Sequence, residues 1–207
     1  MEPGKLYHVY THANGFENLF RSDENYRYFL KRCDHFIPTV ADTLAWCLMP
    51  NHIHFLVRIK TEAELRDVYV LKHPEKELPD DEQTLQGFKT LEEFTIRQFG
   101  HLFNSYTQAF NKMYKRMGSL FIHSFKRKEI TSDSYLTNII FYIHTNAIRH
   151  GFVKEITDWP WCSFHDVLAE TPTTLKRDEI IEWFGNREEF IRFHQQSALN
   201  EMPEFDI

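Results

Sequence analysis

Residues 43–59 read TLAWCLMPNHIHFLVRI, and this stretch decides the fold. Two largely apolar runs, Thr43–Met49 and His52–Ile59, lie on either side of Pro50 and Asn51. Proline and asparagine favour turns, so the sequence predicts two strands joined directly to each other. The second strand begins with two histidines that alternate with one isoleucine.

The segments on either side of this pair of strands extend the pattern. An alternating stretch near the start predicts a strand, and a run of apolar residues at helical spacing follows Asp23, which can cap a helix. After the strands come a helix, a strand-like stretch and a last helix that starts at Ser132 or Asp133. We therefore expect an α+β fold, a ferredoxin-like β-α-β-β-α-β sandwich with an added helix and C-terminal helices. The expected flanking elements are Leu6–Thr11, a helix from Asp23 to Pro38, a helix over Phe99–Met113 and ending near Gly118, a strand within Ser119–Ile130, and a helix ending at Gly151.

Two segments depart from this pattern. In residues 62–93, charges, prolines and a glycine interrupt the apolar pieces, which predicts an insertion or a flexible excursion within a domain of residues 1–154. Residues 155–207 carry twelve acidic and four basic side chains, but they are also rich in aromatic residues. They are therefore expected to pack on the core as a helical extension.

The formal net charge of −6 disguises an uneven distribution. Between Asn104 and Lys154, eight basic residues face only two acidic ones, which is a plausible footprint for phosphate groups. A solvated charged face is the ordinary alternative. Three widely spaced cysteines, with no C-x-x-C pair, indicate buried thiols in a reducing compartment. No secretion signal or membrane span is expected, so we predict a cytoplasmic protein.

The two histidines of the second strand have the spacing of a metal chelate. Residues two apart point to the same face of a strand, so His52 and His54 lie on one side. Their Cα atoms are expected roughly 6 to 7 Å apart, which lets both imidazoles reach one ion at bonds of about 2.1 Å. Chance occurrence is a comparable explanation, because the chain contains 12 histidines. The turn that delivers the pair at the start of a strand favours a site.

The last helix of the core has a polar row beside its apolar stripe. At about 100° per residue, Tyr135, Asn138, Asn146 and Arg149 lie within roughly 40° of Tyr142. Tyr142 and Asn146 are four residues apart, so a phenol and an amide oxygen are neighbours, and an amide oxygen is a suitable ligand for Mg²⁺ or Mn²⁺. A structural tyrosine is the commoner explanation of such a pattern.

Five ordered motifs resemble one family. YHVYTHANG, MPNHIHFLV, SLFIHSFKRKEI, YIHTNAIRHGFV and DWPWCSFHDVL, in this order, are similar to the single-tyrosine HUH transposases, including the REP-associated tyrosine transposases. The resemblance runs from about Tyr7 to Leu168, with a break over the charged excursion. Relatives tend to read NPVRAG where this chain reads NAIRHG, a difference that removes no catalytic group.

The resemblance implies a catalytic domain over residues 1–154 that cleaves and rejoins single-stranded DNA, often near a hairpin, through a 5′-phosphotyrosine. It implies Tyr142 as the nucleophile, and His52, His54 and Asn146 as ligands of a divalent metal, Mg²⁺ or Mn²⁺. Lys126, Arg127, Lys128 and Arg149 are the candidate contacts to the DNA backbone. A homodimer, with a site shared between subunits, is one arrangement known among such proteins. The competing hypotheses are a domesticated, non-catalytic DNA-binding or regulatory protein of the same fold, and a metal-dependent phosphodiesterase that uses water.

Overall fold

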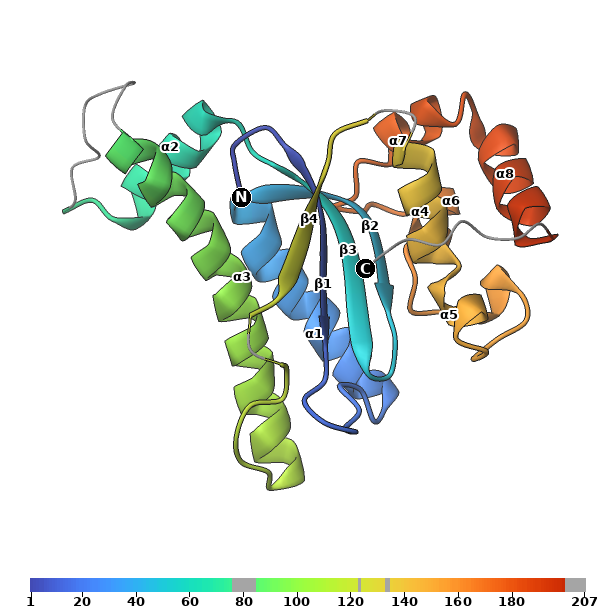
Figure 1. Ribbon diagram of the computed structural model, residues 1–207, viewed down its shortest axis with the longest axis horizontal. Coiled ribbons are helices and arrows are strands. Elements are labelled where there is room, and N and C mark those ends of the chain that lie inside the picture. Colours follow the sequence, from blue (N-terminus) through green and yellow to red (C-terminus); the bar gives the residue numbers. More distant parts are fainter. Residues whose placement is uncertain (76–84, 123, 133–134, 200–207) are drawn as a thin grey trace.

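The computed structural model describes residues 1–75, 85–122, 124–132 and 135–199, with only the backbone described at 85–90 and 196–199. Four antiparallel strands form one sheet in the order β2-β3-β1-β4. This order follows from the βαββαβ chain path and confirms the ferredoxin-like fold (Figure 1). The strands are β1 (Leu6–His12), β2 (Ala41–Leu48), β3 (His52–Ile59) and β4 (Lys126–Ile130).

The helices cover the two faces of the sheet. Helices α1 and α3 pack against each other on one face, and α4 packs on β2 and β3 from the other (Figure 1). Further short helices follow α4 along the chain. No helix in the described part of the chain has the length and apolar character needed to cross a membrane. The helices are α1 (Asp23–Phe36), α2 (Glu62–Lys72), α3 (Leu85–Tyr114), α4 (Leu136–His144), α5 (Asn146–Arg149), α6 (Phe164–Leu168), α7 (Arg177–Trp183) and α8 (Arg187–Leu199), with short 3₁₀ turns at Ile37–Thr39 and Ile156–Asp158.

Alternation along the strands separates the two faces of the sheet. Phe55 on β3 packs against Phe29 of α1, with ring centroids 6.4 Å apart. Its neighbours His54 and Leu56 point to the other face, toward α4, and both are buried. The histidine pair of β3 therefore faces α4.

The region 62–93, for which we expected an insertion or an excursion, is regular over much of its length. Helix α2 begins after Thr61, whose hydroxyl accepts a hydrogen bond from Glu64 N–H while the Glu64 carboxylate accepts one from Thr61 N–H. This capping box and the buried Leu65 hold the helix in place despite its weak apolar pattern. The backbone of α3 is helical from Leu85 onward. Residues 76–84 lie outside the described residues.

The predicted helix from Ser132 or Asp133 to Gly151 is interrupted. Helix α4 ends at His144, and α5 starts at Asn146. Thr145 separates them, and its hydroxyl donates to the Phe141 carbonyl at 2.8 Å, a bond that bends helices. The expected start falls partly on residue 133, outside the described residues. Gly151, with a φ of 70°, follows α5 as expected of a residue that ends a helix.

A chain of buried hydrogen bonds ties the C-terminal helices to α4 and to the sheet. Trp46 N–H donates to Ser163 Oγ at 2.8 Å, and the Ser163 hydroxyl donates to His144 Nε2 at 2.8 Å. His144 Nδ1 donates to His194 Nε2 at 3.0 Å, and His194 Nδ1 donates to the Phe190 carbonyl at 2.8 Å. In this chain of hydrogen bonds every N–H or O–H donor has one acceptor, and this is possible only if both imidazoles are neutral.

This arrangement predicts acid sensitivity of the fold. Burial lowers the pKa of His194 to about 4 and holds that of His144 well below 6.5. The unfolded chain therefore binds more protons below pH 6.5, so stability that is complete above that pH is lost as the pH falls toward 4. We expect each histidine to lower the unfolding free energy by up to about 1.4 kcal/mol per pH unit in this window.

Denaturant titrations between pH 7.5 and pH 4.5 measure this slope. His194→Gln should have a shallower slope than the wild type, and His35→Gln, at an exposed position of α1, should keep the wild-type slope. Equal slopes in all three proteins would contradict the explanation.

Candidate active site

The two histidines of β3 meet α5 at the buried end of the site. His52 and His54 are 2% and 3% exposed, and their ring centroids are 5.1 Å apart at an interplanar angle of 87°. The side chain of Asn146, fully buried at the start of α5, brings its Oδ1 within 3.0 Å of His52 Nε2. The Asn146 amide thus meets His52, which lies beside His54, although the two segments are far apart in the sequence.

The hydrogen bonding around His52 fits a cation. Its Nδ1 lies 2.8 Å from Asn51 Oδ1 and its Nε2 lies 3.0 Å from Asn146 Oδ1, so two carbonyl oxygens flank the ring. Burial lowers the pKa of His52 to about 4, and a neutral imidazole has only one N–H to donate. A metal ion between Nε2 and Oδ1 would satisfy both lone pairs.

The buried Asn146 amide also carries an orphan atom. Its Nδ2 has no hydrogen-bond partner among the described residues. Turning the amide over would let Nδ2 donate to His52 Nε2. Within the described residues no group of three or more His, Cys, Asp or Glu side chains could hold a metal. If three side chains from this part of the chain hold a metal here, they are the two imidazoles and the amide oxygen.

His8 on β1 orients the second histidine. Its Nε2 lies 2.9 Å from His54 Nδ1, and the two rings stack with centroids 5.1 Å apart. Burial, with a smaller effect of Lys128, lowers the pKa of His8 to about 3, so His8 is neutral, and its Nε2 can accept the Nδ1 proton of His54. This bond leaves Nε2 of His54 as its ligating nitrogen. Such a partner commonly fixes the tautomer of a metal-binding histidine.

Tyr142 of α4 lies next to the histidines. Its ring centroid is 5.6 Å from that of His54 and 6.0 Å from that of His8, both edge to face. The Arg149 guanidinium stands 5.1 Å from the centre of the Tyr142 ring. Burial raises the pKa of Tyr142, and the neighbouring Asn146 amide and Arg149 charge act in the opposite direction. The interruption at Thr145 leaves the phenol and the amide on the same side of the sheet.

The predicted basic residues do not form one patch. In the β1–β4 register Lys126 pairs with Tyr10 and Lys128 with His8, so both lysines share the face of the histidines. Arg127 pairs with Val9 and points to the other face, toward α3. Lys126 Nζ lies 5.8 Å from the Tyr10 ring centre. Lys126, Lys128 and Arg149 therefore surround the site, and Arg127 does not.

Sequence reasoning missed the contribution of β1. His8, Tyr10 and His12 share one face of this strand, and Tyr10 and His12 pair directly with His54 and His52 in the neighbouring strand. The His12 ring stacks on the His52 ring, with centroids 4.9 Å apart. The ring centroid of the exposed His150 lies 4.6 Å from that of His52. The alternation of YHVYTH places these side chains on one face of a strand. Only the order of the strands shows that this face adjoins the histidine pair.

No family model matches the chain. Over 164 residues, 77% of this chain and 76% of the relative, it is 27% identical to a protein of Haemophilus influenzae named "Putative REP-associated tyrosine transposase". A shorter match, 46% identical over 28 residues, covers 14% of this chain and 17% of the REP-associated tyrosine transposase of Escherichia coli K12. A solved structure of a REP-associated tyrosine transposase bound to a REP hairpin superposes with a TM-score of 0.54, at 18% identity. The match covers 83% of this chain and 84% of the chain in the solved structure.

Proposed function

Because the chain is related to the REP-associated tyrosine transposases, and so to the HUH tyrosine transposases, we propose that it cuts and rejoins single-stranded DNA. Tyr142 is the nucleophile, and His52, His54 and Asn146 hold a divalent metal, Mg²⁺ or Mn²⁺. The substrate is DNA that contains a hairpin, as in the solved relative. The observation that supports this function best is the convergence of Tyr142, Asn146 and both histidines on one face of the sheet.

The reaction moves one proton and exchanges one ester for another. The Tyr142 hydroxyl oxygen bonds to the scissile phosphorus, the bond from phosphorus to the 3′ oxygen breaks, and the tyrosine proton ends on the released 3′-hydroxyl. Reversal rejoins the strand without another energy source, since the phosphotyrosine retains the ester bond. When bound, the metal supplies charge neutralisation at the phosphate.

The protein side chains supply position and charge. Arg149 stands beside the phenol and favours its ionised form against the opposing effect of burial. His8 fixes the orientation of His54, and the buried walls of the site keep the histidines neutral. Lys126 and Lys128 lie on the edge strand β4, where they can contact phosphates on either side of the cut.

The two lysines predict a salt-dependent effect. Replacing Lys126 and Lys128 by alanine should reduce the slope of log affinity against log salt by about 0.7 for each phosphate contact to a single strand. Fluorescence anisotropy with a labelled hairpin oligonucleotide, measured from low to moderate salt, gives this slope. Lys31→Ala, at an exposed position of α1 on the opposite face, is the matched control and should leave the slope unchanged. An unchanged slope in the double variant would remove these lysines from the DNA interface.

The function is tested by incubating the full chain with Mn²⁺ and single-stranded oligonucleotides that carry hairpins from repeats beside its gene. We expect strand cutting and a protein–DNA species that survives denaturing electrophoresis. Cutting without this species indicates water as the nucleophile. Binding without cutting indicates a domesticated, non-catalytic DNA-binding protein.

A further inference from the structure

Two of the buried cysteines face each other across a short pairing at the edge of the sheet. Cys47 of β2 forms an antiparallel bridge with Cys162, which lies in the 159–163 segment before α6. Two backbone hydrogen bonds of 2.9 Å flank this bridge, one on each side. They run from Leu48 N–H to the Trp161 carbonyl and from Ser163 N–H to the Trp46 carbonyl. Because these bonds are made by the neighbouring residues, the two cysteines are a non-hydrogen-bonded pair, the kind whose side chains approach most closely.

This pairing geometry suits a disulfide bond. The Cα atoms of a non-hydrogen-bonded antiparallel pair are about 4.5 Å apart, and disulfide bonds join residues whose Cα atoms are roughly 4.4 to 6.8 Å apart. Cys47 and Cys162 are directly opposite each other, so their side chains also lie on one face. A bond between the two Sγ atoms therefore requires little movement of the backbone.

The two thiols lie on the face of the sheet that carries the histidine pair. Cys47 pairs with His54 in the register of β2 and β3, so their side chains share this face. The Sγ of Cys47 lies 3.7 Å from Met49 Sδ. The Sγ of Cys162 lies 3.6 Å from the carbonyl oxygen of His144, the last residue of α4. The cysteine pair is therefore held between β2 and the junction of α4 with α5.

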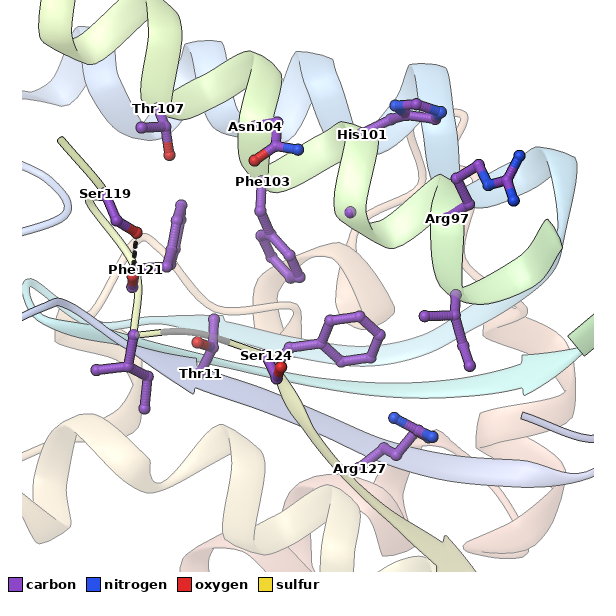
Figure 2. Close-up of a pocket in the computed structure, with 14 residues that line it drawn as sticks. Thr11, Arg97, His101, Phe103, Asn104, Thr107, Ser119, Phe121, Ser124 and Arg127 are labelled. Atoms are coloured by element: carbon purple, nitrogen blue, oxygen red, sulfur yellow. Dashed lines mark hydrogen bonds between the residues drawn. The ribbon is translucent and has the colours of Figure 1, made fainter. Parts of the chain in front are cut away.

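The third cysteine lies on the other side of the sheet. Cys33 of α1 lines a small pocket together with Trp46 and Phe55, which point to the face opposite that of Cys47. A larger cavity beside α3 lies on that face too, and none of its described lining residues is a cysteine (Figure 2). The sheet thus separates Cys33 from the other two thiols, which makes Cys33 an internal control.

Both sulfur atoms of the pair are buried, so their oxidation requires the 159–163 segment to open. Cys47 is fully buried and Cys162 is 1% exposed. The segment is paired with the edge strand β2 through an isolated bridge, and Pro160 beside the bridge is exposed. Opening of one such segment costs less free energy than unfolding of the whole protein, and it exposes both thiols together. After the segment closes, burial protects a new bond from reductants.

We propose that Cys47 and Cys162 form a reversible disulfide bond when the protein is exposed to hydrogen peroxide. The sulfur of one cysteine attacks the peroxide, so that an S–O bond forms, the O–O bond breaks and one water leaves. The sulfur of the other cysteine attacks this sulfenic acid, so that the S–S bond forms and the S–O bond breaks with release of a second water. The two thiols lose two electrons and two protons, and the peroxide takes up both. The bond fastens the 159–163 segment to β2, independently of the proposed function.

The test maps the bonds of the full chain. The protein is exposed to hydrogen peroxide for several hours just below its unfolding temperature, and the remaining thiols are blocked under denaturing conditions. Protease digestion without reduction is followed by mass spectrometry. We expect the peptide of Cys47 joined to that of Cys162, lighter than their sum by two hydrogen atoms, with Cys33 blocked as a free thiol. Dithiothreitol should restore both thiols.

Thermal unfolding gives a second measurement. The oxidised chain should unfold about 5 °C or more above the reduced chain, because the bond restricts the unfolded chain. Cys33→Ala should form the bond and show the same increase, and Cys162→Ala should show none. Three free thiols after the exposure, a bond to Cys33, or separate oxidation of Cys47 and Cys162 to sulfinic acids would overturn the proposal. These results do not depend on DNA cutting by Tyr142, so the proposed function fails or stands separately.

Discussion

Tyr142→Phe is expected to reduce strand cutting by at least about a thousandfold and to abolish the covalent protein–DNA species. The substitution removes one hydroxyl and leaves the ring that packs against His54 and His8, so fold and DNA binding should be preserved. Loss of a nucleophile commonly costs several orders of magnitude in rate, because no neighbouring group forms the same bond. Single-turnover assays with a labelled hairpin oligonucleotide measure the rate and the adduct together.

The matched control is Tyr135→Phe. Tyr135 belongs to the same polar row and directly precedes α4, and it is half-buried. It should cut at close to the wild-type rate. Equal cutting by Tyr142→Phe and the wild type would show that Tyr142 is structural.

The second large effect concerns the metal ligands. His54→Gln and Asn146→Leu should each weaken Mn²⁺ binding a hundredfold or more and reduce cutting to a similar extent, since each removes one of the three proposed protein ligands. Asn146→Asp keeps an oxygen at the same position and adds a charge, so it should retain Mn²⁺ binding. Isothermal titration calorimetry and the Mn²⁺ electron paramagnetic resonance signal give this affinity without any substrate.

His101→Gln, at an exposed position of α3, is the control for the loss of a histidine. If His54→Gln bound Mn²⁺ as tightly as the wild type, the metal site would have to be sought elsewhere. If only Asn146→Leu bound Mn²⁺ as tightly as the wild type, the two histidines would remain as proposed ligands and the amide would be excluded.

Much of the fold could be predicted from local patterns. The hairpin around Pro50 and the alternation in β1 are periodic signals that depend only on neighbouring residues. The ferredoxin-like order then follows from the chain path. The charged helix α2 was missed because its apolar pattern is weak, although Thr61 and Glu64 carried the capping signal.

The site was only partly predictable. His52 and His54 share a strand face by the geometry of a single strand, so the pair could be recognised. His8 joins them only because β1 pairs with β3, since His8 and His54 are 46 residues apart in the sequence. The division of Lys126 and Arg127 between opposite faces likewise needed the register of β4.

The most direct measurement is the identity of the residue that becomes attached to DNA. The full chain is incubated with Mn²⁺ and a cleavable hairpin oligonucleotide, digested with nuclease and protease, and examined by mass spectrometry. We predict a nucleotide attached through its 5′ phosphate to the peptide that contains Tyr142. A nucleotide on another residue, or a cut strand with no nucleotide attached to the protein, would contradict the assignment of Tyr142 as the nucleophile.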